Sequence, residues 1–508
     1  MDFPSYLDLS NLKALFPADF TPGEVAQAQT AFLKRLALKA HAFYGGKMTT
    51  VPKAGIYGFG WFGVWYTPGV SAISTAIRDN NLRSFDLSNR SNLVAVVSDS
   101  TRVLGDGDCT PSGGLGVMEG KAFLMYYLGG VDAISLCINT HTEPGSHKPG
   151  FDFKGLGRHE HSANKLIEFV RMVAPSVGAV NLEDISQPNC FRVLDDLQDC
   201  GIPVWHDDAQ GTACVTLAGM INALKLAGKE LRRSKAVFLG AGAANSTIVR
   251  LLLAEGLDPS NVIVFDANGA LHGGRDDLQN DPGFYRQWDL CQKTNPQRVD
   301  DIREACKGAD ILCALSAPGP GVVKKEWISS MAEKAIVFTC ANPVPEIYPF
   351  EAKEAGAYIV ATGRSDFPNQ VNNSMCFPGL LKGALLVNAS RVTDRMAIAA
   401  AHSLAKSQQH RGLDVDHIMP SMEDIAVFPR EAADVAAQAI RDGVAKRPMD
   451  PEAVFQQTVR DIQNNRETVQ MLMEREKIKT PPKSMIDEAV LETVREIRGV
   501  TSDEGFGR

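Results

Sequence analysis

Short apolar runs recur along the middle of the chain and alternate with longer segments of mixed polarity. Each run is predominantly apolar and is followed by turn-forming residues, a pattern typical of strands that are buried on both faces of a parallel sheet. The alternation of such strands with helical segments predicts an α/β fold with a Rossmann-like, doubly wound parallel sheet. The predicted strands span residues 93–98, 177–180, 202–205, 235–239, 262–266, 311–315, 336–339 and 358–361.

The remaining hydrophobic patterns are helical or aromatic. Helices are predicted at 24–39 and 212–225, the second of them amphipathic, and from residue 441 onward the chain becomes charged and helical. The aromatic, glycine-rich segment 57–66 is predicted to be a strand that runs into a Pro-Gly turn. That turn would place the hydroxyl of Tyr66 at the mouth of a site, although an aromatic anchor with its hydroxyl in water is the simpler interpretation.

A βαβ dinucleotide-binding pattern lies between residues 235 and 266, where a strand, a helix and a second strand follow one another. Gly240 and Gly242 allow the backbone to approach a pyrophosphate at the N-terminus of the helix. Asp266 ends the second strand, where an acid can bond the adenosine ribose hydroxyls of NAD and repel the 2′-phosphate of NADP. Two features qualify this interpretation: Asn245 replaces the third glycine, and Arg275 could offset the acid. NADP therefore stays an alternative.

Two acidic pairs directly follow predicted strands, Glu183 with Asp184 and Asp207 with Asp208. Carboxylates at the ends of buried strands have little water to solvate them and need a partner. Because no Lys or Arg adjoins either pair in the sequence, we expect a divalent cation, and oxygen ligands suit Mg²⁺ or Mn²⁺. Successive strand residues face opposite ways, so the chain must turn at the first pair, and only one acid of the second pair should coordinate. Capping of the following helices is the alternative interpretation.

Composition limits the class of protein. A chain of 508 residues is long for a single core and predicts at least two domains. The formal net charge of −8, without a long basic run, argues against nucleic acid and anionic membranes as partners. The 10 cysteines form no CxxC pair, and neither a signal peptide nor a membrane span is evident. These features predict a cytoplasmic protein with reduced thiols.

Several polar residues are candidates for chemistry but also have plainer interpretations. Lys121, near the start of a helix after a glycine-rich turn, could bind a carboxylate, act as a base, or lie solvated on the surface. Asn342, Asn372 and Asn373 could bind a carboxylate or a nicotinamide, or form turns. The segment 139–162 is expected to be a surface loop, although histidine-rich tracts also bind metals. Its histidines are His141, His147, His159 and His161.

A set of short motifs extends from about Tyr66 to about Ala401. They are Tyr66-Thr-Pro-Gly-Val70, Arg102-Val-Leu-Gly105, Glu119-Gly-Lys-Ala122, Asn181-Leu-Glu-Asp184, His206-Asp-Asp-Ala-Gln-Gly-Thr-Ala213, Gly240-Ala-Gly-Ala-Ala244, Ser316-Ala-Pro-Gly319, Ala341-Asn-Pro343, Ala361-Thr-Gly-Arg-Ser-Asp-Phe-Pro-Asn-Gln-Val-Asn-Asn373 and Phe377-Pro-Gly379. Through these motifs, in this order, the chain resembles the malic enzymes, the oxaloacetate-decarboxylating malate dehydrogenases. The resemblance implies oxidative decarboxylation of L-malate to pyruvate and CO₂, with NAD or NADP as oxidant and with a divalent metal.

The resemblance also implies roles for individual residues. The metal ligands would be Glu183, Asp184 and Asp208. Lys121 would be the general base and Tyr66 the general acid, with Asp207 tuning Lys121. Malate would be held by Arg102, Asn342, Asn372 and Asn373. The cofactor would be bound by Gly240, Gly242, Ala243, Ala244, Asn245, Asp266, Ser316 and Asn342. Lys121 must be neutral to act as a base, so its pKa is expected to be depressed.

We expect an N-terminal α/β catalytic domain at 1–210, an NAD(P)-binding Rossmann-like domain at 211–440 and a helical tail at 441–508. The resemblance implies a homodimer or homotetramer in which Tyr66 or Lys121 could act in the neighbouring subunit. Departures from the family pattern are Asn245, Asp106, Cys109 and the long loop after Asn139. Malolactic chemistry, in which malate yields lactate and CO₂, is one alternative function. A non-catalytic nucleotide-binding regulator is another.

Overall fold

The computed structural model describes residues 4–103, 106–146, 148 and 161–499. The sequence predictions for Leu104, Gly105, His147 and His159 therefore fall outside the described residues. The chain forms two compact units, one made of Met1–Thr50 with Arg466–Arg508 and the other of Val51–Asn465. Among the described helices, none combines the length and the apolar character that a membrane crossing requires.

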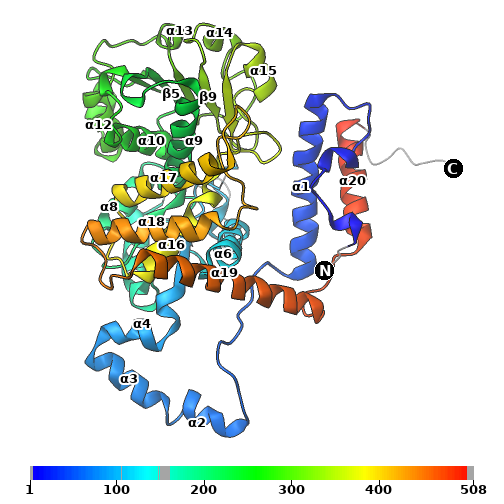
Figure 1. Cartoon of the computed structure of the whole chain (residues 1–508), viewed down its shortest axis with the longest axis vertical. Coiled ribbons are helices and arrows are strands. Elements are labelled where there is room, and N and C mark those ends of the chain that lie inside the picture. The colour runs from blue at the N-terminus through cyan, green and yellow to red at the C-terminus, as the bar shows by residue number, and fades with distance from the viewer. Residues whose placement is uncertain (1–3, 104–105, 147, 149–160, 500–508) are drawn as a thin grey trace, which may run out of the picture. The chain divides into compact units, whose positions relative to one another are not determined.

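The smaller unit is a pair of packed helices, α1 (Pro22–Tyr44) and α20 (Lys483–Ile497) (Figure 1). Thr21 begins α1 with a capping box: its side chain accepts a hydrogen bond from the Glu24 backbone N–H, and the Glu24 side chain accepts one from the Thr21 backbone. The helix predicted at 24–39 is thereby confirmed. The packing of the two ends of the chain on each other was not predicted. The apolar core of this unit contains Phe16, Ala28, Phe32, Ile486 and Ala489.

The first sheet of the larger unit has four parallel strands in the order β2–β1–β3–β4. The central strands are buried except at Leu93, which explains why their sequences are mostly apolar. The strand β2 lies at the edge and is only half buried, so its mixed sequence gave no strand signal. The strands are β1 (Leu93–Ser98), β2 (Asp132–Cys137), β3 (Ala179–Leu182) and β4 (Val204–His206). The helices of this region are α5 (Thr110–Gly113), α6 (Leu115–Gly129), α7 (Ala163–Val173) and α8 (Asn189–Asp196).

The second sheet has six strands in the order β10–β9–β8–β5–β6–β7, parallel except for β7. Strand order reverses between β5 and β8, the point at which doubly wound sheets bind nucleotides. The predicted doubly wound sheet is therefore confirmed. The strands are β5 (Ala236–Leu239), β6 (Val262–Asp266), β7 (Gly269–Ala270), β8 (Ile311–Ala314), β9 (Ile336–Thr339) and β10 (Ile359–Thr362). The helices around them are α9 (Thr212–Ala227), α10 (Ala243–Ala254), α11 (Asp276–Gln279), α12 (Tyr285–Lys293), α13 (Ile302–Cys306), α14 (Lys325–Ser329) and α15 (Pro349–Glu354).

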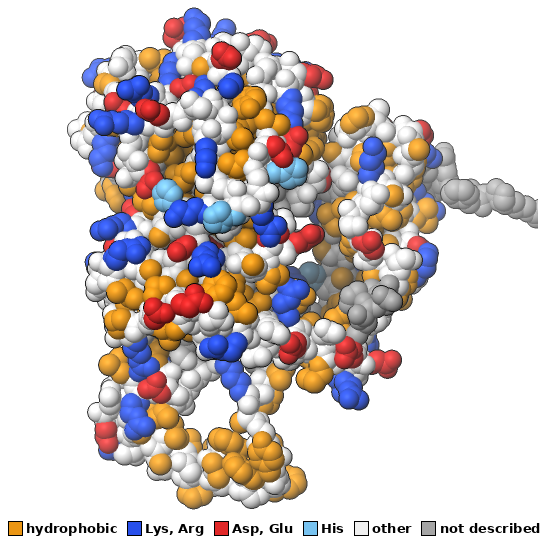
Figure 2. Space-filling view, viewed as in Figure 1, with side chains coloured by type: hydrophobic (Ala, Val, Ile, Leu, Met, Phe, Trp, Pro, Cys, Tyr) orange, Lys and Arg blue, Asp and Glu red, His pale blue; other side chains and the backbone are white. Residues whose placement is uncertain are grey.

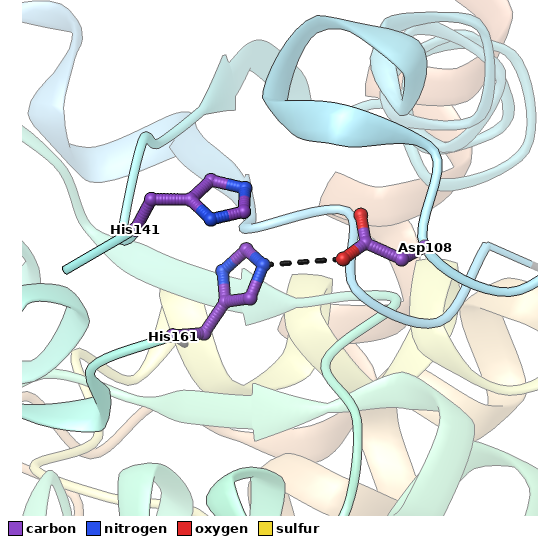
Figure 3. Close-up of side chains that lie close together, drawn as sticks. All are labelled: Asp108, His141 and His161. Atoms are coloured by element: carbon purple, nitrogen blue, oxygen red, sulfur yellow. Dashed lines mark hydrogen bonds and ion pairs between the residues drawn. The ribbon is translucent and has the colours of Figure 1, made fainter. Parts of the chain in front are cut away.

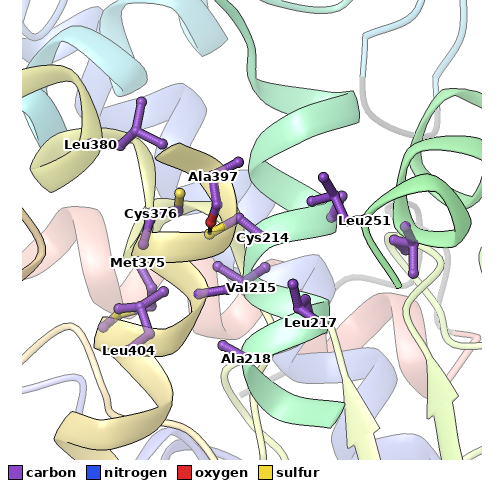
Figure 4. Packing of buried hydrophobic residues seen from close by; sticks show 14 of the residues in the cluster. Cys214, Val215, Leu217, Ala218, Leu251, Met375, Cys376, Leu380, Ala397 and Leu404 are labelled. Atoms are coloured by element: carbon purple, nitrogen blue, oxygen red, sulfur yellow. Dashed lines mark hydrogen bonds between the residues drawn. The ribbon is translucent and has the colours of Figure 1, made fainter. Parts of the chain in front are cut away.

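A layer of helices joins the two sheets of the larger unit. Helix α9 packs against α10 and α17, α17 against α18, α18 against α16, and α16 against α6 (Figures 1 and 4). One hydrophobic cluster runs through this layer and includes residues of both sheets. The prediction that α9 is amphipathic was wrong, because the helix is buried on nearly all sides between its neighbours. The further helices of the layer are α16 (Phe377–Leu386), α17 (Asp394–Arg411) and α18 (Val427–Arg441), and α19 (Pro451–Glu474) follows them in the chain.

Residues 51–79 lie away from both sheets of their unit (Figure 1). The strand predicted at 57–66 is wrong: the segment forms a 3-10 turn and a short helix, α2 (Phe62–Trp65), and the Tyr66 N–H donates to Phe62 O at 2.8 Å. Glycine and aromatic residues alternate here with the two-residue period of a strand. The backbone N–H and C=O groups, however, form their hydrogen bonds within local turns and not with another strand. The helices α3 (Val70–Asp79) and α4 (Ser84–Leu87) follow. Many apolar side chains of this segment are exposed, as Figure 2 shows at the bottom of the view.

One carboxyl group is buried without a counter-charge inside the helical layer. Glu431 of α18 is fully buried, and neither carboxyl oxygen has a hydrogen-bond donor among the described residues. The thiols of Cys214 and Cys376 lie beside it, within 4.8 Å. Burial raises the pKa of Glu431 well above its usual range, and the nearby Cys214 adds to this shift. Folding therefore favours the neutral form of this carboxyl group.

We expect Glu431→Gln to make thermal stability less sensitive to pH. The unfolded chain releases the Glu431 proton above its ordinary pKa of about 4.5, whereas the folded chain keeps it, so folding takes up a proton. Stability of the unaltered protein should fall as pH rises above that value, and glutamine, neutral at every pH, removes this contribution. The Tm of the variant relative to the unaltered protein should increase from about pH 5 to about pH 8. The exposed Glu333→Gln serves as control, and a Tm difference independent of pH would contradict the expectation.

Candidate active site

The first acidic pair lies immediately beyond the end of β3. Because β3 ends at Leu182, the side chains of Glu183 and Asp184 do not have to point to opposite faces of the sheet. Asp184 has a positive φ of 53°, which turns the chain. The Glu183 N–H donates to Val97 O at 2.9 Å, and the Arg102 N–H donates to Asp184 O at 3.0 Å. These backbone contacts hold both carboxylates on one side of the sheet edge, as the sequence analysis required.

The second acidic pair begins a single turn of π-helix, Asp207–Gly211, between β4 and α9. Such turns are rare and often occur at functional sites, because they re-aim side chains. Here the turn directs Asp207 and Asp208 to different neighbours. Gly211 allows the turn to close, since a Cβ at this position would lie 2.0 Å from Asp207 Oδ1.

Glu183, Asp184 and Asp208 form an acidic cluster, in which one oxygen of each carboxylate lies within 4.8 Å of the others. The Asp184 N–H donates to Asp208 Oδ2 at 2.7 Å, and Asn181 Nδ2 donates to Glu183 Oε2 at 2.9 Å. Glu183 and Asp184 are almost fully buried. Asp208 is half-buried. A set of three oxygen donors with this spacing fits Mg²⁺ or Mn²⁺.

Lys121 of α6 reaches the acidic cluster from the other side. Its Nζ lies 3.0 Å from Glu183 Oε1 and forms an ion pair with Asp207, whose other oxygen accepts from Trp205 Nε1 at 3.0 Å. It also donates to Asn373 Oδ1 at 3.1 Å. The sequence showed no basic residue near either acidic pair, because Lys121 is 86 residues away from Asp207 in the chain.

The electrostatics of this centre differ from expectation. Burial lowers the pKa of Lys121, but the charges of Asp207, Glu183 and Asp208 outweigh it, so the pKa of Lys121 lies above its usual value rather than below it. Burial raises the pKa of Glu183 well above its usual range, against the opposing charge of Lys121, and the other carboxylates add to the shift. The centre therefore has more negative charge than one lysine can offset. A bound cation would stabilise the ionised carboxylates of such a centre.

The candidate substrate residues are only partly brought together. Asn373 contacts Lys121, and the backbone of Arg102 contacts Asp184. The Asn372 side chain accepts from the Ser374 N–H at 2.9 Å, which is the turn-forming role considered in the sequence analysis. Asn342 is exposed after the end of β9. Tyr66, which is 71% exposed, lies on the segment that extends away from the sheets (Figure 1).

The nucleotide-binding turn follows β5 at the switch point. Gly240 has a φ of 98°, and a Cβ there would lie 2.3 Å from Leu315 O, so only glycine fits. Asn245, the departure from the glycine pattern, donates from Nδ2 to Leu239 O at 3.0 Å and to Gly240 O at 2.8 Å. Its side chain thus closes the turn that leads into α10. Gly242, Ala243 and Ala244 form the start of that helix.

Across the switch point, Ser316 is hydrogen-bonded to Glu346, a residue that was not predicted from the sequence. The Ser316 N–H and hydroxyl both donate to Glu346 Oε1, at 2.9 and 3.3 Å, and the Ala341 N–H donates to Glu346 Oε2 at 3.1 Å. Burial raises the pKa of Glu346 to about 6, although these hydrogen bonds oppose the shift. Glu346 thereby ties together the turns after β8 and β9. The only sequence signal was an acid inside a proline-rich turn.

Asp266 does end β6, as predicted, but both of its oxygens are engaged by Arg275. Arg275 donates to Asp266 at 3.0 and 2.7 Å and to Asp277 at 2.8 and 2.7 Å. The hydrogen bonds from Arg275 lower the pKa of Asp277 to about 2. Two carboxylates share one guanidinium, so the group of Asp266, Arg275 and Asp277 carries a net charge of −1.

The fold and the site together define a class of protein. It is an α/β enzyme in which a dinucleotide-binding sheet lies beside a buried centre of carboxylates and one lysine.

Comparison with known proteins identifies the family. The models "Malic enzyme, N-terminal domain" and "Malic enzyme, NAD binding domain" match residues 60–198 and 209–440. The crystal structure of Entamoeba histolytica malic enzyme is 53% identical with a TM-score of 0.92, covering 96% of this chain and 98% of that one. A bifunctional malic/malolactic enzyme of Bacillus subtilis is 38% identical over 84% of this chain and 98% of its own. An NAD-dependent malic enzyme of Geobacillus stearothermophilus is 39% identical over 79% of this chain and 78% of its own.

The chain belongs to the malic enzyme family, whose members are oxidoreductases that decarboxylate malate with NAD or NADP. The resemblance inferred from the sequence motifs is thereby confirmed.

Proposed function

We propose that the protein catalyses the divalent-metal-dependent oxidative decarboxylation of L-malate to pyruvate and CO₂ with reduction of NAD(P)⁺. The observation that carries the proposal is the convergence of Lys121, from α6, with carboxylates from the ends of both β3 and β4. A general base next to a cluster of oxygen ligands is the arrangement that this reaction needs.

Glu183, Asp184 and Asp208 would hold the metal ion, since they provide three oxygen donors within 4.8 Å of one another. When bound there, Mg²⁺ or Mn²⁺ would act as a Lewis acid on the C2 oxygen of malate and would offset the negative charge that raises the pKa of Lys121. Asp207 is left out of this set and instead orients Lys121, with Trp205 fixing the Asp207 carboxylate.

Lys121, in its neutral form, would accept the proton of the C2 hydroxyl of malate. Oxidation at C2 gives a β-keto acid, and cleavage of its C3–C4 bond releases CO₂ and leaves the enol of pyruvate. Tyr66 would then donate a proton to C3. Arg102, Asn342, Asn372 and Asn373 are proposed to hold the carboxylates of malate, because arginine and amide side chains suit that geometry.

The nucleotide would bind at the switch point of the second sheet, over the turn of Gly240 and Gly242 and the start of α10, with Ser316 opposite. Its nicotinamide ring would supply the oxidant that accepts the hydride from C2. The net negative charge of Asp266, Arg275 and Asp277 would repel a 2′-phosphate, which favours NAD over NADP.

A homodimer or homotetramer is proposed to complete the site. Tyr66 is exposed, while Lys121 is buried in the centre of the larger unit. The segment that carries Tyr66 exposes Phe59, Phe62, Val64 and Trp65, an apolar surface suited to contact with a second copy. In such an assembly Tyr66 of one chain would act with Lys121 of the other. We further propose a reducing, cytoplasmic location, because all 10 cysteines are free thiols.

Asp208→Ala is expected to reduce turnover of malate by about a thousandfold or more, because the metal site loses a ligand and the reaction its Lewis acid. Steady-state kinetics with saturating Mn²⁺ measure the loss, and electron paramagnetic resonance of Mn²⁺ measures the weakened binding. Asp196→Ala, at an exposed carboxylate of α8, is the matched control and should behave as the unaltered protein. Near-normal turnover of Asp208→Ala would refute the metal assignment.

Mixing two inactive variants tests whether the site is shared between chains. Lys121→Ala and Tyr66→Phe should each lose nearly all activity. Hybrid dimers of the two should recover up to about a quarter of normal activity, because one site of each hybrid contains both intact residues. The control mixture of Lys121→Ala with Asp207→Asn should recover none, because these residues contact each other within one chain. Absence of recovery in the test mixture would place Tyr66 and Lys121 of one site on the same chain.

An assay with malate and Mn²⁺, run side by side with NAD and NADP, tests the reaction and the cofactor preference. We expect reduced nucleotide and pyruvate in equal amounts, loss of turnover with EDTA, and a higher kcat/KM with NAD because of the charge around Asp266. Lactate formed without net reduced nucleotide would instead identify malolactic chemistry, which the name of the Bacillus subtilis relative makes a specific alternative. The absence of any malate turnover would favour a non-catalytic regulator.

A further inference from the structure

A second cluster of metal-ligating side chains lies outside the catalytic centre, at the base of the histidine-bearing loop. From its sequence, segment 139–162 is expected to be a surface loop. That expectation is wrong for its described ends, because His141 and His161 are 1% and 7% exposed. The two residues pair as an antiparallel bridge, and the Ser162 N–H donates to Thr140 O at 3.0 Å. Their rings lie 3.8 Å apart, centroid to centroid, and face Asp108 from the loop after β1 (Figure 3).

The contacts around His161 fit a proton on its Nδ1 nitrogen. The buried Asp99 carboxylate accepts from the Thr140 hydroxyl at 3.3 Å, so the oxygen of that hydroxyl is left to accept from His161 Nδ1 at 2.7 Å. With the Thr140 hydroxyl donating to Asp99, His161 Nδ1 bears the hydrogen. A carboxylate that fixes a histidine tautomer in this way, here through a threonine, is characteristic of the outer shell of metal sites.

The other nitrogen of His161 then directs its lone pair at an acceptor. His161 Nε2 lies 3.2 Å from Asp108 Oδ2. A lone pair and a carboxylate oxygen at this distance repel each other unless a cation lies between them. That cation is either a proton, which would make His161 an imidazolium, or a metal ion shared by both atoms.

The donor set favours a metal ion. Asp108, His141 and His161 each offer a ligand atom, and these atoms lie within 4.8 Å of one another. Two imidazoles with one carboxylate suit Zn²⁺, which binds them at about 2.0–2.2 Å and would separate tetrahedral donors by about 3.3 Å. The 3.2 Å between His161 and Asp108 matches that separation. The Asp108 side chain is 21% exposed, so an ion has a path from solvent and a place for a water ligand.

We propose that Asp108, His141 and His161 bind a Zn²⁺ ion distinct from the ion of the acidic cluster. Asp108 lies on the loop after β1, and both histidines lie at the two ends of the loop after β2. The ion would therefore fasten one loop to the other. The loop after β1 also carries Thr101, whose hydroxyl accepts from the Ser186 N–H at 2.8 Å, and Arg102, whose N–H donates to Asp184 O. The zinc site would thus fix the position of a loop that borders the malate site.

Zinc retention tests the proposal. The protein, loaded with Zn²⁺ and dialysed against excess Mg²⁺, is expected to keep about one zinc ion per chain. The Asp208→Ala protein should keep the same ion, because Asp208 belongs only to the acidic cluster. Asp108→Asn and His161→Ala should each reduce retained zinc by about tenfold or more. His402→Ala is the matched control, since this histidine bonds Glu255 at 2.8 Å elsewhere in the unit. Elemental analysis gives the zinc content.

Two results would overturn the proposal. Retention of less than about a tenth of an ion by the unaltered protein would mean that a proton fills the gap, as an imidazolium–carboxylate pair. Equal retention by Asp108→Asn and the unaltered protein would place the zinc elsewhere. Because the Asp108 side chain is partly exposed, its replacement does not depend on refolding a buried site. Substitution with Co²⁺ gives a second measurement, since the visible absorption of tetrahedral Co²⁺ should appear in the unaltered protein and disappear in Asp108→Asn.

The effect on catalysis rests on the proposed malate activity, whereas zinc retention is measured without malate. Removal of the ion by Asp108→Asn should raise the KM for malate a few-fold and leave kcat nearly unchanged, because the loop that carries Arg102 loses an anchor. A fall in kcat with an unchanged KM would contradict this role for the ion. If the protein failed to turn over malate, the zinc measurement would still stand.

Discussion

Four carboxylates meet a single ammonium group, and three of them, Glu183, Asp184 and Asp207, are almost fully buried. This arrangement is the constraint on which the rest of the structure depends. Glu183, Asp184, Asp207 and Asp208 meet Lys121 at the carboxyl ends of β3 and β4. Fully ionised, this centre would carry three uncompensated negative charges in a region with little water. Such a group is costly to form without a counter-ion. Burial raises the pKa of Glu183, and the excess of negative charge adds to this shift because it disfavours a further carboxylate charge. Burial lowers the pKa of Lys121, but the same excess of negative charge outweighs burial and raises this pKa, because it favours the ammonium form.

The surrounding fold divides the carboxylates between two tasks. In a regular strand or helix the backbone fixes the directions in which neighbouring side chains point. The left-handed backbone at Asp184 and the π-turn at Asp207–Gly211 change these directions. Asp208 joins the pair after β3, while Asp207 pairs with Lys121. One carboxylate therefore fixes the position of Lys121, the proposed base, and three are left for the proposed ion. The helix α6 is packed against α16, which fixes the starting point of the Lys121 side chain.

The sequence predicted those parts of the molecule that depend on burial and on local turns. Strands such as 336–339 and 262–266 were predicted with the bounds that the structure has, because strands covered on both faces leave a continuous apolar run. The acidic pairs could be placed at strand ends for the same reason. The approach of Lys121 could not, since no local pattern encodes a contact across 86 residues, and this residue was singled out through family resemblance.

The errors also have physical causes. The edge strand β2 is half exposed and so has no apolar run. Segment 57–66 has a two-residue period because glycine alternates with aromatic residues, not because it pairs with a strand. Asn245 looked like a weakness of the nucleotide-binding turn, yet its amide supplies the hydrogen bonds that close that turn. His141 and His161 looked like loop residues because their burial results from pairing across the loop, which the sequence does not display.

The loop after β1 links the catalytic centre to the cluster of Asp108, His141 and His161. Its Thr101 and Arg102 contact the turn after β3, and its Asp108 contacts His161. An ion that holds Asp108 restricts the conformations open to this loop, so malate would meet a backbone that is already ordered. Thermodynamic linkage then requires the reverse effect of the same size: whatever factor zinc contributes to malate affinity, malate contributes to zinc affinity. Because both sites act through one short segment, this coupling needs no rearrangement of either sheet.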